Sequence, residues 1–167
     1  LVTELTYGSI KNRGHLDYIL DQFAKVKTTK MDKMVRNILR LALYQMLYLE
    51  RIPTSAAVNE AVHLAKKNAN RGSEKFVNGI LRNIDRNREK IVYPQKKRQP
   101  VQYFSVMYSF PQWMVEQWYK NYGAAQTEAL CRYFNEPQPL WIRANTLKIS
   151  PKELERRLLE RGYQVTA

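Results

Sequence analysis

The sequence has few of the residues that build disulfides, metal sites and membrane spans. Its 167 residues include one cysteine, Cys131, and two histidines, His15 and His63. A single thiol excludes an internal disulfide and indicates a reducing compartment such as the cytoplasm. So few sulfur and imidazole ligands, without paired spacing, argue against a zinc or other metal site. No apolar run reaches the roughly 18 residues of a membrane-spanning helix, so we expect no membrane partner.

Acidic residues are also in short supply. There are 28 Lys and Arg against 15 Asp and Glu, which gives a formal net charge of +13. Such an excess keeps a protein soluble, and it also favours binding to a polyanion, most plausibly a nucleic acid. Charge alone leaves both interpretations open.

Signals for catalysis and cofactor binding are missing as well. We find no glycine-rich turn between a strand and a helix, so no cofactor site is predicted in this chain. Cys131 is flanked by Leu130, Tyr133 and Phe134 without a nearby His or Asp motif. We interpret it as a packing cysteine and not a nucleophile. No catalytic residue is predicted.

What the sequence does contain is helical periodicity over its first 90 residues. Apolar residues recur at the spacing of amphipathic helices. Asp32 can cap the helix after it, Thr54 or Ser55 the next one, and Ser73 the last. Lys25 to Lys30, in the connection before Asp32, carries three lysines and no acid. Short loops predict a compact bundle with its most apolar helix at the centre. The predicted helices span residues 2–11, 16–23, 33–49, 54–69 and 74–88.

The character of the chain changes after the last of these helices. Residues 91–100 are basic, and prolines at both Pro94 and Pro100 interrupt regular structure, so we predict a linker. Residues 101–167 read as a second unit with helices, a strand at 140–145, a capping box opening a helix at Ser150, and a strand from 163 onward. The abrupt beginning and end of the pattern predict a fragment of a longer protein.

Two long signatures resemble known families. Ala56 to Lys67, read AAVNEAVHLAKK, and Phe76 to Leu81, read FVNGIL, resemble the NusB family of all-helical RNA-binding domains. Ser109 to Trp113, Asn135 to Pro137 and Leu140 to Lys148 resemble the domain that precedes the catalytic domain in RNA cytosine-5 methyltransferases of the RsmB/Sun/Fmu group. That group carries a NusB-like domain in front, in the order seen here.

The resemblance implies a fold and a function. It implies a mainly α protein: a NusB-like bundle at 1–90, a basic linker at 91–100, and the start of a small, incomplete RRM-like α+β domain at 101–167. The full-length protein would methylate small-subunit ribosomal RNA with S-adenosylmethionine in the cytoplasm. Its catalytic domain is absent here, so this piece is expected to be non-catalytic and to bind RNA.

Basic residues near the signatures are the RNA-binding candidates, because phosphate binding sums many weak cation contacts. Each one alone is equally well a solvated surface charge. Two alternatives stay open: a NusB-like antitermination module acting through a protein partner, and a helical adaptor whose charge only keeps it soluble. Aromatic residues from Tyr103 to Trp118 fit core packing better than base stacking. The candidates are Lys66, Lys67, Arg71, Lys75, Arg82, Arg86, Arg88, Lys96, Lys97, Arg98, Arg143 and Lys148.

Overall fold

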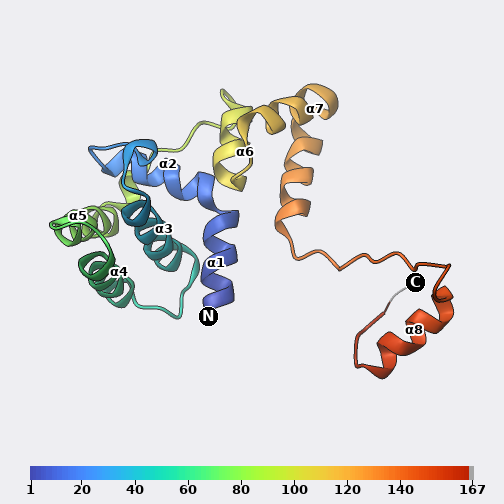
Figure 1. Ribbon diagram of the computed structural model, residues 1–167. Helices are drawn as coiled ribbons and strands as arrows, with labels where there is room; N and C mark the ends of the chain where they lie inside the picture. The colour runs from blue at the N-terminus through green and yellow to red at the C-terminus, as the bar shows by residue number, and fades with distance from the viewer. Residues whose placement is uncertain (166–167) are drawn as a thin grey trace. The chain divides into compact units, whose positions relative to one another are not determined.

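The computed structural model describes residues 1–165 and is mainly helical (Figure 1). The chain divides into two compact units, Leu1–Asn135 and Glu136–Ala167. Within the described residues there are eight α-helices and two 3₁₀ turns, and no strand. The predicted helical character is therefore confirmed.

The first two helices of the larger unit are almost continuous. α1 (Val2–Lys11) and α2 (Arg13–Phe23) are separated only by Asn12, whose side-chain amide donates to the Gly8 carbonyl at 2.9 Å. Gly8 also faces α3 (Lys33–Tyr48): a Cβ placed there would lie 2.1 Å from the Tyr44 ring. The missing side chain thus lets α1 approach its neighbour closely.

Helix α3 is the central element and contacts α1, α2, α4 (Thr54–Asn68) and α5 (Ser73–Arg86). The Asp32 carboxylate caps it, accepting from the amides of Met34 and Val35 at 2.9 and 3.1 Å, as predicted. On its polar side, Arg40 donates to both carboxylate oxygens of Asp17 in α2, at 2.6 and 2.7 Å. This bidentate pair fixes the orientation of α2 on α3.

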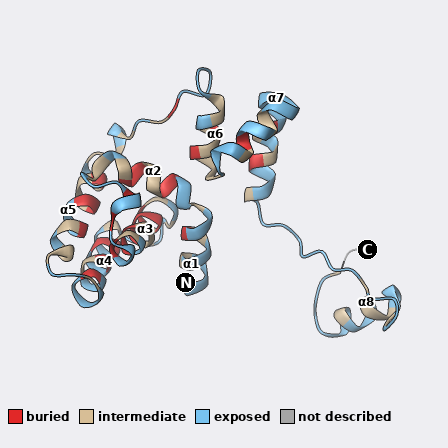
Figure 2. Cartoon of the chain, turned by 45° about the horizontal axis from the view of Figure 1, so that its top comes forward, coloured by how far each residue is buried: buried red, intermediate tan, exposed pale blue. Residues whose placement is uncertain are grey.

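The main hydrophobic core lies where α2 to α5 meet, and the buried positions gather there in Figure 2. Each leucine or isoleucine fully buried in such a core stabilises the fold by about 1.5–3 kcal/mol relative to exposure. The side chains with no exposed surface include Leu16, Ile19, Leu20, Leu39, Leu43, Val58, Val77, Leu81 and Ile84.

Helices α4 (Thr54–Asn68) and α5 (Ser73–Arg86) form an antiparallel hairpin. The turn between them ends at Gly72, whose φ of 89° lies in the left-handed region that favours glycine. This turn carries one end of the candidate site.

The predicted caps of the hairpin helices are wrong. The residues at the cap positions are Pro53 and Gly72, and no side chain caps either helix. Thr54 and Ser73 already have helical geometry, so their hydroxyls do not occupy the position from which a cap accepts the first free amides. The Thr54 hydroxyl accepts instead from Arg88 at 2.8 Å.

After the 3₁₀ turn Arg88–Lys90, two further helices build a smaller core. α6 (Pro100–Tyr108) packs on α7 (Gln112–Asn135) around Phe104, Val115 and Cys131. Helix α7 is two helices joined at Gly123, which has φ 73° and ψ 179°. The glycine therefore forms a sharp bend within α7.

Polar contacts connect α6 and α7 to the beginning of the chain. The Gly14 amide donates to the Ser109 hydroxyl at 2.8 Å, and the Lys11 ammonium donates to the Asn135 carbonyl. Ser109 itself is left-handed, with φ 60°. Both cores thus belong to one compact unit.

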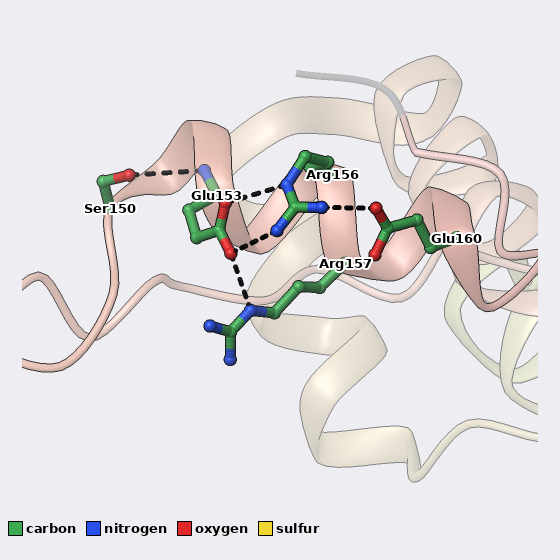
Figure 3. A network of polar contacts seen from close by, with 5 residues as sticks. All are labelled: Ser150, Glu153, Arg156, Arg157 and Glu160. Carbon is green, nitrogen blue, oxygen red and sulfur yellow. Dashed lines mark hydrogen bonds and ion pairs between the residues drawn. The ribbon is translucent and has the colours of Figure 1, made fainter.

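In the smaller unit, the described regular structure is one helix, α8 (Pro151–Glu160). The Ser150 hydroxyl accepts from the Glu153 amide at 3.3 Å, which confirms the predicted cap. The Glu153 carboxylate then accepts from Arg156 and Arg157, and Arg156 also pairs with Glu160 (Figure 3). Because Glu153 binds these arginines, it does not complete a reciprocal capping box.

The predicted strands of the second domain are not formed. Residues 140–145 and 163–165 have no regular structure, and the rest of the second predicted strand lies outside the described residues. A strand needs a neighbour to pair its amides and carbonyls, and neither stretch has one within residues 1–165. Leu140 and Trp141 are consequently 90% and 82% exposed. The described part of the second unit is helical, not α+β.

Candidate nucleic-acid interface

Four of the predicted cations lie together at the α4–α5 turn, and we call Lys66, Lys67, Arg71 and Lys75 the turn cluster. All four side chains are exposed. Lys66 and Lys67 occupy the last turn of α4, where positive charge is favoured by the helix dipole. Within residues 1–165 none of the four forms an ion pair. The cluster is therefore available for phosphates.

The cations at the other end of α5 differ from the turn cluster. Arg86 lies eleven residues after Lys75, about 16 Å along the helix, and is exposed. Arg82 is partly buried. The Arg88 guanidinium donates to the Met46 carbonyl at 3.1 Å, and also to Thr54 and Asp85. Arg88 thus links the end of α3 to the start of α4 and is occupied within the fold.

The linker cations are divided between a structural contact and a free surface. Lys96 pairs with Glu128 of α7 at 2.6 Å and lies 5.7 Å from the centre of the Phe104 ring. This hydrogen bond from Lys96 is the main reason why the pKa of Glu128 is lowered. Lys97 and Arg98 are exposed and form no ion pair in the described chain.

The remaining two candidates belong to the smaller unit. Arg143 and Lys148 both precede α8 in the chain, and both are exposed. The strand expected to present them is not formed within the described residues.

The structure adds a group of cations that the sequence-based set omitted. Lys25, Lys27 and Lys30 are all exposed, in or just before the 3₁₀ turn Thr28–Lys30. Lys30 lines the same hollow as Arg71 of the turn cluster, although the two are far apart in sequence. The run of lysines without an acid was the available signal, but its position beside the α4–α5 turn is a tertiary feature.

Candidate cations lie next to open hollows on the larger unit. One, of about 310 Å³, lies between the connection before α3 and the α4–α5 turn. The other, of about 360 Å³, is lined by linker residues that include Tyr93 and Arg98. Both lie next to candidate cations.

The described residues show no arrangement suited to catalysis. Burial raises the pKa of the Cys131 thiol to about 11, so the nucleophilic thiolate is disfavoured at neutral pH. His15 is buried, and its ring nitrogens contact the Tyr48 and Tyr93 hydroxyls. No group of three or more potential metal ligands occurs among residues 1–165.

These residues also do not fit S-adenosylmethionine. An adenosyl site of the usual kind needs a glycine turn between a strand and a helix. Here Gly72 precedes α5 without a strand before it, Gly123 bends α7, and Gly162 follows α8. In addition, no helix within the described part of the chain is long and apolar enough to cross a membrane.

A helical bundle with a basic hairpin turn, followed by a second helical region, defines a modular and mainly α class of protein. The profile of the NusB family matches residues 1–86, more than half of the chain, and the chain belongs to this family. A second profile, the ferredoxin-like domain of RsmF/B-like methyltransferases, matches residues 110–167. The resemblance noted in the sequence is confirmed.

Relatives of two kinds are similar to this chain. It is 40% identical over 167 residues to the probable ribosomal RNA small subunit methyltransferase B of Synechocystis sp., and 39% over 165 residues to that of Bacillus subtilis. Each match covers 99% of this chain and 36% of the relative. The transcription antitermination protein NusB of Heliobacterium modesticaldum is 45% identical over 84 residues, covering 50% of this chain and 41% of the relative.

A solved structure shares the fold. The crystal structure of PH0851 matches with a TM-score of 0.69 and 22% identity, over 99% of this chain and 36% of that one. The chain thus spans about a third of the length of the methyltransferase relatives and of this structure.

Proposed function

We propose that this chain is the RNA-binding N-terminal region of a ribosomal RNA cytosine-5 methyltransferase. It would hold small-subunit ribosomal RNA for a catalytic domain outside these residues, and that domain would bind S-adenosylmethionine. The similarity to two named small-subunit methyltransferases along almost the whole chain supports this reading. The protein would act in the cytoplasm, where its RNA substrate is assembled.

One observation carries the RNA-binding role: the turn cluster is exposed and forms no ion pair within the described residues. A cation paired with a protein carboxylate must lose that partner before it binds a phosphate, whereas these four need not. Such contacts supply affinity and orientation but no choice of sequence. The net charge of +13 adds long-range attraction for RNA.

A salt series tests the role. Affinity for a helical fragment of small-subunit ribosomal RNA should fall steeply with salt, with a log–log slope of about −4 or steeper. The fragment should also be preferred over duplex DNA. A flat slope with negligible affinity would refute RNA binding by this region.

Charge-reversal variants test which group of cations contacts the RNA. Lys66→Glu with Lys67→Glu should reduce the slope by about 2, one for each lost phosphate contact. Lys120→Glu with Lys152→Glu is the matched control, since both are exposed, unpaired within the described chain and outside the candidate set. Equal losses in the two variants would mean that only net charge matters. Lys97→Glu with Arg98→Glu, and Arg143→Glu with Lys148→Glu, test the other two groups.

A second candidate function is antitermination through a protein partner. It is favoured by the 45% identity of half the chain to a transcription antitermination protein. Residues 110–167, which match a methyltransferase-associated domain, argue against it. Tight binding to a ribosomal protein or elongation factor, together with weak binding to ribosomal RNA, would favour the antitermination role.

We also propose the domain division 1–90, 91–100 and 101–167. Two separate hydrophobic clusters on either side of the linker support it, although both clusters lie within the compact unit Leu1–Asn135. The strands expected at 140–145 and from 163 onward would form only in the longer protein, where further strands could pair with them. The ferredoxin-like profile over residues 110–167 supports this idea.

A further inference from the structure

The hollow beside the α4–α5 turn combines an apolar floor with a polar rim. Val26, Met31, Val35 and Phe76 supply apolar surface. Met31 and Val35 are almost fully buried, while Val26 is 41% exposed and Phe76 is partly buried against the main core. Its volume of about 310 Å³ is at the lower end for small-molecule sites. A hollow of this size with four apolar residues in its lining is suited to a small, mostly apolar group.

The rim carries two cations from different segments. Lys30 comes from the 3₁₀ turn before α3, and Arg71 from the α4–α5 turn. Within residues 1–165 neither forms an ion pair. Gly72, also in the rim, has no side chain. Among the described residues, no atom would lie within 4 Å of a Cβ placed on it, so the space beside it is open. Two unpaired cations at the mouth of an apolar hollow favour an anionic ligand with an apolar part.

Asp32 adds an acceptor to the same rim. Its Oδ1 already accepts from the amides of Met34 and Val35 as the cap of α3. The other carboxylate oxygen, Oδ2, makes no hydrogen bond within the described chain. It can accept from an N–H donor, and a carboxylate prefers bases that carry an amino group, such as cytosine.

From these features we infer that the hollow binds one unpaired nucleotide of the RNA. The base lies on the apolar floor against Phe76, its phosphates contact Lys30 and Arg71, and Asp32 selects bases with an amino group. This rests on the proposed RNA-binding role and adds a specificity that phosphate contacts lack. Proteins read RNA sequence mainly through unstacked bases held on aromatic surfaces, which fits a hollow between two basic segments.

The experiment uses the whole chain and RNA hairpins that differ in one position. The hairpins are fully paired or carry a single bulged cytosine or uridine. The bulged-cytosine hairpin should bind at least about fivefold tighter than the paired one, as expected for one base stacked on an aromatic side chain. It should also bind at least about fivefold tighter than the bulged-uridine hairpin, because only cytosine offers an amino group to Asp32.

Asp32→Asn is the sharpest variant. Asparagine caps helices as well as aspartate does, so the fold is retained, which circular dichroism and a urea midpoint verify. With the amide oxygen in the cap, the free atom changes from an acceptor to a donor. The preference should therefore invert in favour of the bulged uridine. Glu89→Gln removes the same charge at an exposed site outside the hollow and should leave the preference unchanged.

The failures can be told apart. If ribosomal RNA binds with a steep salt slope but the bulge and Asp32→Asn have no effect, the hollow is not a nucleotide site and the proposed function stands. If no RNA binds, both proposals fall. If a short acidic peptide with a central phenylalanine binds the hollow and bulged RNA does not compete, the site takes a protein, and the inference is wrong.

Discussion

At the scale of single residues, two helical glycines lie in opposite surroundings. A Cβ at Gly8 would come within 2.1 Å of the Tyr44 ring, whereas a Cβ at Gly79 meets nothing within 4 Å. Tyr44 is also held by a 2.6 Å hydrogen bond that its hydroxyl donates to Glu4. A methyl group at position 8 must displace this ring or separate α1 from α3.

We therefore expect Gly8→Ala and Gly79→Ala to change stability in opposite directions. Gly8→Ala should lower the free energy of unfolding by about 1–3 kcal/mol, the usual cost of overpacking. Gly79→Ala should raise it by about 0.5–1 kcal/mol, since alanine is the better helix former. Urea denaturation of both variants measures the two effects. Stabilisation by Gly8→Ala would show that α1 does not pack on Tyr44 as described.

Arg88 and Arg86 are both candidate RNA-binding cations, but they should contribute differently to the stability of the fold. Arg88→Ala leaves the Met46 carbonyl and the Thr54 hydroxyl without their donor, and should cost about 1–3 kcal/mol of stability. Arg86 is exposed and, within residues 1–165, donates only to the Arg82 carbonyl of its own helix. Arg86→Ala should change the urea midpoint little. An equal loss of stability in both variants would contradict the role assigned to Arg88.

At the scale of elements, α8 offers a helix whose stability depends on pH. Hydrogen bonds from Arg156, and then Arg157, lower the pKa of Glu153 from its ordinary value of 4.5 to about 2. A carboxyl with a lowered pKa in the folded state stabilises that state above its unfolded value and loses the effect as pH falls. The contribution of Glu153 to α8 is thus complete above about 4.5 and disappears as pH falls through about 2.

Carbon chemical shifts of residues 151–160 should accordingly lose helical character between pH 4.5 and 2. Because these pairs are exposed, added salt should weaken the effect. In Glu153→Gln the same residues should be less helical at neutral pH, with no step in this range from position 153. A wild-type helix whose shifts stay constant down to pH 2 would show that these ion pairs do not support it.

The elements also show what a sequence can reveal. Helix bounds in the first 90 residues are predicted to within a few residues, because amphipathic spacing is a local property. The predicted caps at Thr54 and Ser73 are wrong because each helix begins one residue earlier than a cap at that position requires. That shift moves the hydroxyl away from the free amides. The strand at 140–145 fails for another reason: a strand depends on a neighbour that its own residues do not specify.

The sequence identified many of the cations of the candidate site, but it did not show which of them lie together in the fold. The turn cluster is continuous with one signature helix, so sequence proximity was enough to find it. Arg88 was included although it is occupied inside the fold, and Lys30 was omitted although it shares a hollow with Arg71. Both depend on contacts between segments that are distant in sequence, which periodicity does not report.

At the scale of the whole molecule, the two cores differ greatly in size. The main core contains nineteen buried side chains and the smaller one three. All three tryptophans, Trp113, Trp118 and Trp141, come after the main core in sequence. Trp118 packs against the smaller core, so tryptophan fluorescence reports on that part of the protein.

Unfolding in urea should therefore give two transitions that do not coincide. Tryptophan fluorescence should change at lower urea than circular dichroism at helical wavelengths, since a core of three buried side chains has little stability of its own. Trp141→Phe, which removes an 82% exposed indole, should leave the fluorescence midpoint unchanged. Coincident transitions would mean that the cores unfold as one cooperative unit.

The main core has a consequence for inheritance. Among the described residues, every side chain that builds it or packs against it lies at or before Ile91. A gene segment that ends there would encode every side chain of this core. Recombination could then join this segment to, or detach it from, other coding sequences without damage to its fold. Closure of the core makes the bundle a portable unit of evolution.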